Sequence, residues 1–342
     1  MSAVLAAQLT IQQRLHRLQV LPIFIIYLNN ICDSRCQTCA IWKNNEFLKD
    51  AAKRNMPDGL LNELYAAMGE WQPRQILVSG GEPALHPRFA EVISRFATLA
   101  PKVCVITNGL LLSSLDRNAL EKVAEFYISF DAPDRESYQT IRGVDGFDRL
   151  AASIQSLNSL TRKPVIVARC TLQRDNVRGI PELIGAAKRM GFQSISFLAV
   201  DVNSAAFSRD VHGASDAAGL QPKAGDLRAM SEDINSLAKS DESFVEGGIP
   251  KLKRILQYFR ALDGDGEFPA VRCNAPWASV VVETTGQIRG CFFQPVIGDF
   301  RTINGDEAVR FRRALKVASD ATCRRCVCSK WLGARDVMRM VD

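Results

Sequence analysis

Three cysteines within eight residues are the part of this sequence best equipped for chemistry. Cys32, Cys36 and Cys39 follow the apolar run 23–28 with the spacing CxxxCxxC. A structural zinc site takes four protein ligands, so three thiolates leave it one short. A four-iron cluster held by three cysteines keeps one iron free of protein ligands, where chemistry can begin. The count of three is therefore a clue to such a cluster, with a partial zinc site or chance clustering as the alternatives.

A second set of cysteines lies near the C-terminus. It contains Cys273, Cys291, Cys323 and Cys326, with Cys328 close by. Four thiolates can complete a zinc site or a four-iron cluster, and the sequence alone leaves both open. Cys328 is left as a spare thiol, an alternative ligand or a hydrogen donor.

Length and composition restrict the class of protein. The 342 residues suffice for one large domain and a smaller one. The net charge of +6 is mild and spread along the chain, so nucleic acid is not an expected partner. No secretory signal is recognised in residues 1–20, and the apolar run 21–28 is too short to span a bilayer. We therefore expect a cytoplasmic protein with no membrane partner, whose ten cysteines do not serve as disulfides.

Short apolar segments alternate with segments of helical spacing up to about residue 200. The expected strands are 22–28, 75–79, 102–106, 126–130, 164–171 and 193–199. The expected helices are 57–70, 88–99, 114–125, 147–160 and 179–190, after an amphipathic helix over 4–20. Six strands with helical crossovers predict an α/β fold, as an open doubly wound sheet or a partial barrel.

The alternation ends near residue 200. Two helices are expected at 226–238 and 250–262, then a hairpin of 278–282 and 287–292, and a helix near 306–318. We divide the chain into an N-terminal helix (1–20), a barrel (21–200), a connecting helical segment (201–268), a small cluster-binding domain (269–332) and a C-terminal helix (333–342).

Polar motifs follow the second, third and fourth predicted strands. They are Ser79-Gly80-Gly81-Glu82-Pro83, Thr107-Asn108-Gly109 and Ser129-Phe130-Asp131. Paired glycines let the backbone approach a ligand closely, and a Glu carboxylate can accept hydrogen bonds from an ammonium group. Carboxyl ends of parallel strands meet at one rim, so these motifs and the first cysteines are expected together there.

These motifs, CxxxCxxC, GGEP, TNG and SFDAP in this order, resemble the radical S-adenosylmethionine (radical SAM) enzymes over residues 20–200. In that family three cysteines hold a 4Fe–4S cluster, and its fourth iron binds the amine and carboxylate of S-adenosylmethionine. One electron then cleaves this cofactor to a 5′-deoxyadenosyl radical, which takes a hydrogen atom from the substrate. The resemblance implies a partial (β/α)6 TIM-like barrel and an electron donor such as flavodoxin or ferredoxin.

The resemblance also implies roles for individual residues. Gly80, Gly81 and Glu82 would hold the methionyl amine. Further cofactor-binding candidates are Asn108 and, for ribose or carboxylate contacts, Ser129, Asp131 and Arg169. One departure is Thr38, because the family has an aromatic residue there that packs near the adenine. Ile41 and Trp42 are expected to cover the nucleotide instead.

Beside such a core, the C-terminal cysteines resemble the twitch or SPASM extensions, which carry auxiliary iron–sulfur clusters. Five cysteines are fewer than a full SPASM set, which implies one auxiliary 4Fe–4S cluster of the twitch type at Cys273, Cys291, Cys323 and Cys326. A structural zinc ion is the alternative. An auxiliary cluster can accept the electron left when a substrate radical is oxidised.

We therefore predict a radical SAM oxidoreductase that acts on a non-activated C–H bond. Peptide-modifying relatives begin with a peptide-recognition domain, and only a short segment precedes the first strand here. This favours a small molecule such as a sugar or cyclitol. A peptide maturase that cross-links or epimerises its substrate is the alternative, and a non-enzymatic metal-binding module is a third possibility. The catalytic acid, base or hydrogen donor is unknown.

Several residues receive structural interpretations. Cys104 and Cys170 lie in predicted strands and are expected to be buried as small apolar side chains. His86 is expected to shape its loop. Asp201 is expected either to point at substrate or to cap a turn. Lys251, Lys253 and Arg254 are expected on a solvent-exposed face of one helix.

Overall fold

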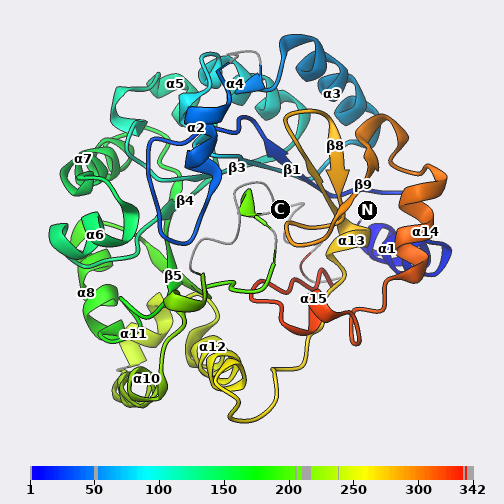
Figure 1. Ribbon diagram of the computed structural model, residues 1–342. Coiled ribbons are helices and arrows are strands. Elements are labelled where there is room, and N and C mark those ends of the chain that lie inside the picture. Colours follow the sequence, from blue (N-terminus) through cyan, green and yellow to red (C-terminus); the bar gives the residue numbers. More distant parts are fainter. Residues whose placement is uncertain are drawn as a thin grey trace.

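A curved nine-stranded sheet forms the centre of the protein, with strand order β6-β5-β4-β3-β2-β1-β7-β8-β9. The computed structural model describes residues 2–49, 53–204, 206–209, 217–237 and 239–333, together with Asp336. The helices lie around the outside of the curved sheet (Figure 1). The predicted α/β partial barrel is confirmed.

Six parallel strands make up the barrel wall, and each pairs with the next along the chain. They are β1 (Ile23–Tyr27), β2 (Gln75–Ser79), β3 (Lys102–Thr107), β4 (Glu125–Ser129), β5 (Val165–Leu172) and β6 (Ser194–Ala199). All five residues of β1 are buried. Parallel strands covered on both faces carry continuous apolar runs, which is why the sequence located them closely.

The helices between the strands agree with prediction at four positions. These are α3 (Asp58–Trp71), α4 (Phe89–Leu99), α7 (Phe147–Asn158) and α8 (Ile180–Met190). The segment 114–125 was predicted wrongly as one helix, because only α5 (Arg117–Leu120) is α-helical and i→i+3 bonds end it at once. Helix α1 (Ser2–Leu15) stops before residue 20, and His16 follows it with φ of 61°.

Helix α6 (Arg135–Arg142) was not predicted. Its sequence is mostly polar and shows few apolar positions, although Tyr138 and Ile141 are buried. Asp134 caps its first turn, and Gly143 ends it with φ of 68°.

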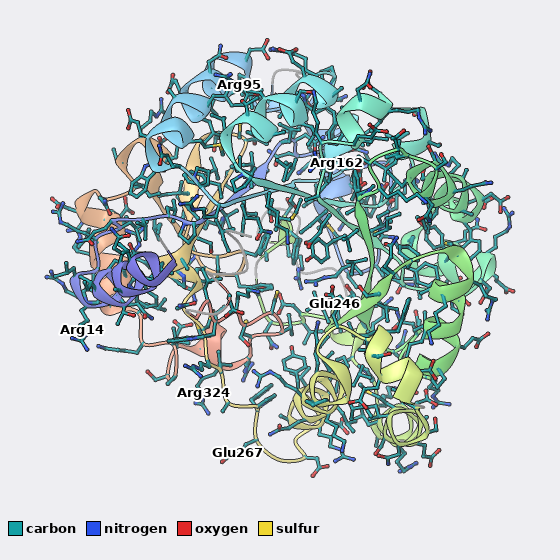
Figure 2. All side chains as sticks on the ribbon, turned by 180° about the vertical axis from the view of Figure 1, so that it is seen from behind. Arg14, Arg95, Arg162, Glu246, Glu267 and Arg324 are labelled. Atoms are coloured by element: carbon teal, nitrogen blue, oxygen red, sulfur yellow. The ribbon has the colours of Figure 1, made fainter. Side chains whose placement is uncertain are left out.

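After β6 the chain forms η5 (Ala217–Leu220), α10 (Ala224–Ser236), α11 (Lys239–Phe244) and α12 (Gly248–Leu262). Just before α12, Val245 forms a parallel bridge with Ile195 of β6. Helix α12 lies beside β6, and with α15 (Ala321–Arg324) it spans the side of the ring that the sheet leaves open (Figure 1). Seen from behind, Glu246 lies toward the middle of the ring, whereas Arg14 and Glu267 lie at its periphery (Figure 2).

The C-terminal strands continue the same sheet. Following α13 (Ala275–Ala278), β7 (Ser279–Val282) pairs in parallel with β1. The predicted hairpin is confirmed, because β8 (Gln287–Arg289) runs antiparallel to β7 around Gly286, which has φ of 87°. Strand β9 (Val296–Asp299) was not predicted and adds a further antiparallel edge. The division into five regions stays a prediction.

The remaining C-terminal elements are short. η6 (Phe300–Thr302) leads to α14 (Asp306–Ala314), which ends four residues before the predicted helix 306–318. Most of the predicted C-terminal helix 333–342 lies outside the described residues. Within the part of the chain that the structure describes, no helix is long and apolar enough to cross a membrane.

Two hydrophobic clusters hold the sheet. The large one fills the space between the strands and the surrounding helices. The small one, which includes Ile25, Tyr27, Val281 and Leu332, joins β1 and β7 to the C-terminal segment. The C-terminal part of the chain therefore packs directly on the strand that precedes the first cysteines.

Candidate functional site

The cysteine loop after β1 runs alongside the GGEP loop after β2. The Gly81 N–H donates to the Asn29 carbonyl at 2.9 Å, and the Glu82 N–H donates to the Ile31 carbonyl at 2.7 Å. The pairing of β1 with β2 thus continues past the strand ends, up to the residue before Cys32. The sequence prediction that these two motifs share one rim is confirmed.

The two glycines of GGEP make this approach possible. A Cβ atom on Gly81 would lie 2.0 Å from the Ile31 carbonyl oxygen, and one on Gly80 would lie 2.5 Å from the Asn29 carbonyl oxygen. Gly80 also has φ of 138°, which other residues rarely adopt. In this structure the glycines give room to the cysteine loop.

Glu82 is almost fully buried beside that loop. Its carboxylate accepts hydrogen bonds from the Thr107 hydroxyl at 2.6 Å, the Asn108 N–H at 2.6 Å and the Ala84 N–H at 3.1 Å. Burial raises the pKa of Glu82 to about 7, although these hydrogen bonds lower it. A cation bound nearby would favour the ionised carboxylate.

Asn108 ties the third strand's motif to the cysteine loop. Its side-chain amide donates to Asp33 Oδ1 at 2.6 Å and to the Ser34 hydroxyl at 3.0 Å, and it lies 3.9 Å from Cys32 Sγ. Its Oδ1 accepts from the Leu110 N–H, which fixes the turn of the TNG motif. Three of the four predicted rim motifs, the cysteine loop, GGEP and TNG, therefore meet through specific hydrogen bonds, rather than only sharing an edge.

Sequence reasoning missed Arg142, at the end of α6. Its guanidinium donates to Asp131 Oδ2 at 3.0 Å in a buried ion pair, and its carbonyl accepts from the Arg35 N–H of the cysteine loop. Burial lowers the pKa of Arg142, but the negative groups around it, Cys36 and Asp131 first, raise it well above its usual value. An Arg-Gly pair ending a polar helix gives no signal in a single sequence.

Both carboxylate oxygens of Asp131 therefore accept hydrogen bonds from groups of the protein itself. Its Oδ1 accepts from the Thr171 N–H at 2.7 Å, while its Oδ2 holds Arg142. Asp131 thus positions β5 and Arg142 at the rim in this structure.

The first three thiols are sheltered from water. Cys36 is buried, and Cys32 and Cys39 are partly buried. Burial, first of all, raises the pKa of each thiol, that of Cys39 to about 12. Iron would therefore have to displace protons when it binds these sulfurs.

The donor set can be compared with what a metal requires. Among the described residues, no group of three or more His, Cys, Asp or Glu is arranged to hold a metal ion. A polynuclear cluster spreads its ligands more widely than a single zinc ion, whose Zn–S bonds are about 2.3 Å. Three sulfur donors on one sheltered loop, with a cationic guanidinium beside them, match a cluster by their chemistry.

The segment from Thr38 to Trp42 contains one buried polar atom without a hydrogen bond among the described residues. Thr38 is half-buried, and Ile41 is buried in η1 (Ile41–Lys43). Trp42 Nε1 is buried and has no hydrogen-bond partner among the described residues. The expectation that Ile41 and Trp42 cover the nucleotide stays a prediction.

The C-terminal cysteines also converge. Gln294 donates to Cys323 Sγ at 3.3 Å, and its own N–H donates to the Cys291 carbonyl. Asp320 caps α15 by accepting from the Cys323 N–H, while the Cys328 N–H donates to Cys326 Sγ at 3.3 Å.

Cys273 is held near Cys328 by hydrogen bonds of the next residue, Asn274. Asn274 forms three hydrogen bonds with Lys330 and Leu332, just beyond Cys328. Burial, together with the charges of Cys328, Cys273 and Cys291, raises the pKa of Cys326, although one backbone hydrogen bond lowers it. Cys326 thus lies within electrostatic reach of Cys273, Cys291 and Cys328, and Cys323 within reach of Cys291.

Tyr27 connects the two sets. Burial raises its pKa, and the charges of Glu283, Cys39 and Cys291 add to that effect. Its ring centroid lies 6.0 Å from that of Phe292, the residue after Cys291. The two cysteine sets are therefore neighbours inside one sheet-based body.

Arg169 and Lys251 meet on the barrel wall. Arg169 of β5 donates to the Ser196 hydroxyl at 3.0 Å and lies 3.9 Å from Cys328 Sγ, whereas Ser129 pairs with it across the sheet. Lys251 Nζ also donates to the Ser196 hydroxyl, at 2.9 Å. The predicted solvent-exposed face is therefore wrong for Lys251, because α12 turns it toward β6, while Lys253 is exposed as expected.

Arg254 and the other structurally interpreted residues can now be placed. Arg254 is half-buried and donates to the Ala270 carbonyl at 2.7 Å. Cys104 and Cys170 are fully buried, as expected. His86 is buried, and its Nδ1 accepts from the Arg88 N–H at 3.2 Å. Asp201 binds Arg209 and its own turn, which favours the turn role.

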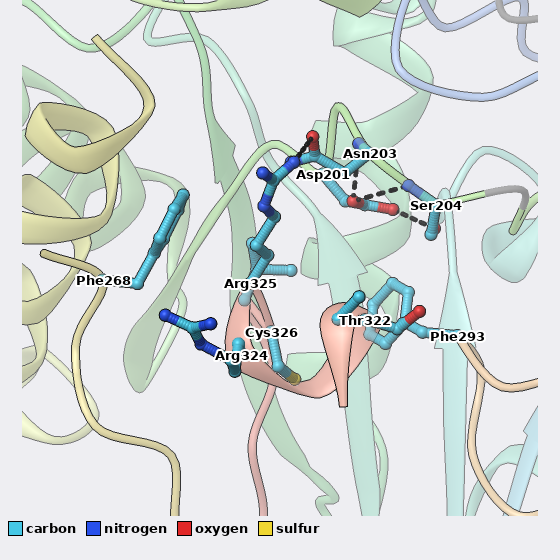
Figure 3. Close-up of a pocket in the computed structure, with 11 residues that line it drawn as sticks. Asp201, Asn203, Ser204, Phe268, Phe293, Thr322, Arg324, Arg325 and Cys326 are labelled. Carbon is cyan, nitrogen blue, oxygen red and sulfur yellow. Dashed lines mark hydrogen bonds between the residues drawn. The ribbon is translucent and has the colours of Figure 1, made fainter. Parts of the chain in front are cut away.

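A pocket of about 360 Å³ opens between the loop after β6 and the second cysteine set. Figure 3 shows Arg325 extending between Phe268 and the Asp201 loop, with Phe293 on the other wall. Arg325 donates to Asn203 at 3.0 Å, and Cys326 lies in the lining. The pocket therefore borders the second cysteine set with aromatic and cationic side chains.

Among curated proteins, GTP 3′,8-cyclases are similar in sequence to part of this chain. The GTP 3′,8-cyclase of Chlorobaculum tepidum is 29% identical over 163 residues, 46% of this chain and 48% of the relative. A probable GTP 3′,8-cyclase of Thermoplasma volcanium is 28% identical over 167 residues, 47% of this chain and 49% of the relative. The matches thus span about half the length of these relatives.

Two solved structures resemble the chain over nearly all of its length. Streptococcus suis SuiB bound to precursor peptide SuiA has a TM-score of 0.62 at 18% identity, covering 94% of this chain and 74% of SuiB. The anSMEcpe structure with bound AdoMet has a TM-score of 0.61 at 16% identity, covering 90% of this chain and 83% of that one. At these identities the likeness shows the fold alone.

The family comparison covers the part of the chain that carries the rim motifs. The model of the Radical SAM superfamily matches residues 26–196, which is half of the chain. This range contains the cysteine loop, the GGEP and TNG motifs and the strands that bring them together. The chain belongs to the Radical SAM superfamily, whose enzymes use a 4Fe–4S cluster and S-adenosylmethionine.

Proposed function

We propose that the protein cleaves S-adenosylmethionine reductively and uses the product to oxidise a small biosynthetic molecule at a non-activated C–H bond. The observation that carries this proposal is the hydrogen-bonded rim, in which the cysteine loop, Glu82 and Asn108 form one buried network. When bound, the cluster and S-adenosylmethionine would supply a 5′-deoxyadenosyl radical. An electron donor such as flavodoxin or ferredoxin would provide the electron.

The protein's own residues hold these groups. Cys32, Cys36 and Cys39 would ligate three irons. Glu82 would accept the methionyl amine, since the hydrogen-bond partners of its buried carboxylate among the described residues include no cation. Gly80 and Gly81 keep the loop close enough for that contact.

The other rim residues orient and shield the cofactor. Asn108 fixes the loop from β3, and Asp131 holds Arg142 beside Cys36. Ser129 lies at the end of β4, and its hydroxyl would contact the cofactor carboxylate or ribose.

The second part of the proposal is an auxiliary 4Fe–4S cluster of the twitch type, ligated by Cys273, Cys291, Cys323 and Cys326. Its support is the convergence of these thiols and their closeness to Cys39 through Tyr27. A cluster there would accept the electron from a substrate radical, and a zinc ion would not. Cys328 would then remain free beside Arg169.

Iron analysis after anaerobic reconstitution tests both sites together. We expect about eight irons per wild-type chain, because each 4Fe–4S cluster contributes four. A variant with Cys32, Cys36 and Cys39 changed to Ala should keep about four, and so should one with Cys291, Cys323 and Cys326 changed to Ala. About four irons plus one zinc in the wild type would contradict the auxiliary cluster.

A peptide substrate is the second candidate. The likeness to SuiB and anSMEcpe extends over the C-terminal part of this chain, and SuiB was solved with its precursor peptide. An epimerase among such enzymes needs a cysteine hydrogen donor, for which Cys328 is the accessible choice. Mass measurement of deuterated candidate substrates and of the resulting deoxyadenosine separates the two: label transferred from a peptide would contradict the small-molecule proposal.

A further inference from the structure

Two cationic side chains converge on one buried hydroxyl inside the barrel. Arg169 Nη1 and Lys251 Nζ donate to Ser196 Oγ at 3.0 Å and 2.9 Å, from β5 and α12. Ser196 itself, on β6, is fully buried. Both bonds use the oxygen as acceptor, and its O–H proton has no acceptor among the hydrogen bonds of the described residues, so it can be donated to a ligand.

The positive charges of Arg169 and Lys251 are not paired with a carboxylate within the described part of the chain. Neither Lys251 nor Arg169 forms an ion pair with any described residue. Burial lowers the pKa of Lys251 to about 8, and the neighbouring Arg169 lowers it further, whereas Glu246 and Cys328 oppose the shift. Half-buried like charges are costly unless an anion accompanies them.

The contacts of Arg169 differ from those of Arg142, the arginine beside the first cysteine loop. The two terminal nitrogens of Arg169 are directed to Ser196 and to Cys328 of the second cysteine set. The guanidinium beside the first cysteine loop belongs to Arg142 instead. Arg169 and Lys251 therefore meet at Ser196, between β5, β6 and α12, and Arg169 reaches the second cysteine set at Cys328.

We propose that Arg169, Lys251 and Ser196 bind an anionic group of the substrate, a phosphate or a carboxylate. Two cations and one hydroxyl donor match the acceptor oxygens of either group. The contact of Arg169 with Cys328 would place the bound molecule next to the second cysteine set. The assignment to substrate depends on the proposed function, whereas the anion site itself does not.

Anion binding to the reconstituted protein tests this site. Inorganic phosphate and acetate are titrated calorimetrically into the wild type, Lys251→Gln, Arg169→Gln, Lys251→Arg and the control Lys253→Gln. Lys253 lies on the same helix and is exposed, so its variant removes the same charge from outside the barrel. We expect one equivalent to bind to the wild type and to Lys253→Gln, and affinity to fall about tenfold or more in the two Gln variants.

Lys251→Arg retains the cation and is expected to bind, which separates loss of charge from misfolding. Tighter binding of phosphate indicates a phosphorylated substrate, and tighter binding of acetate indicates a carboxylate. Wild-type affinity in Lys251→Gln, or no stoichiometric binding to the wild type, would overturn the site. Deoxyadenosine formation by the same wild-type preparation reports on the proposed function independently: a protein that binds the anion through Lys251 but does not cleave S-adenosylmethionine keeps the anion site and loses the function.

Discussion

At the residue scale, hydrogen bonds connect Glu82 to Asn108 and Asn108 to the cysteine loop. The Glu82 carboxylate accepts from the Asn108 backbone, and the Asn108 side chain donates to Asp33 and Ser34 of the cysteine loop. Both residues are almost fully buried. In such a network, removing one member leaves its partners without hydrogen bonds in a place that water does not reach.

Changing Asn108 to Ala should therefore weaken both folding and iron loading. We expect the free energy of unfolding to fall by about 1–3 kcal/mol, since Asp33 and Ser34 lose their donor. The iron content per chain should fall with it, because the loop carrying Cys32 is no longer fixed. Denaturant unfolding and iron analysis measure both effects, and the exposed Asn118→Ala serves as the control. Full iron loading in Asn108→Ala would contradict the positioning role.

The charge of Lys251 gives a pH dependence. Its pKa is lowered to about 8, so the cation is present below pH 8 and is lost as the pH rises through that value. The charged and titratable groups that face it are Arg169, Glu246, Cys328 and Lys330. Sulfate does not titrate in this range, so its affinity for the wild type should fall between pH 7 and pH 9. Calorimetry should show a much flatter profile for Lys251→Arg, and equal slopes would count against Lys251 as the titrating group.

At the scale of elements, the loops after β1 and β2 behave as one unit. Their backbones continue the strand pairing, and no side chain fits between them at Gly81. The end of α6 packs on the same loop from the other side, where a Cβ on Gly143 would lie 2.5 Å from the Arg35 carbonyl oxygen. Close backbone contacts, more than side-chain packing, thus hold the cysteines in place.

Gly81→Ala should separate the two loops. The added methyl group would meet the Ile31 backbone at 2.0 Å, so the cysteine loop must shift. We expect a loss of more than about 2 kcal/mol in unfolding free energy, with reduced iron loading. Gly69→Ala in α3 is the matched control, because nothing lies within 4 Å of its Cβ position and Ala favours a helix by about 1 kcal/mol. Unfolding curves of the two variants should shift in opposite directions; a stable, iron-loaded Gly81→Ala would refute the packing argument.

Some of these elements could be predicted from the sequence, and others could not. The six barrel strands and the rim motifs were predictable, because buried parallel strands and strand-end glycines leave strong local patterns. Helix α6 and Arg142 were not, since a polar helix becomes significant only when β4 and the cysteine loop close around it. Lys251 was misjudged for a similar reason: whether it faces solvent depends on how α12 docks against β6, which no local spacing encodes.

At the scale of the whole molecule, one sheet carries both cysteine sets. Strand β1 leads into the first set, and β7, its parallel neighbour, begins the hairpin that leads to Cys291. Tyr27 and Phe292 join them, while α12 and α15 cover the open side of the ring (Figure 1). The strands that lead to the two cysteine sets therefore belong to one sheet.

Cofactor cleavage tests the central claim most directly. The wild type is reconstituted anaerobically with iron and sulfide, and then mixed with dithionite and S-adenosylmethionine; 5′-deoxyadenosine is quantified by mass spectrometry. We predict that the wild type forms 5′-deoxyadenosine and that the variant with Cys32, Cys36 and Cys39 changed to Ala forms none. No product from an iron-loaded wild type, or equal product from the triple variant, would contradict the assignment of this loop as the site of radical formation.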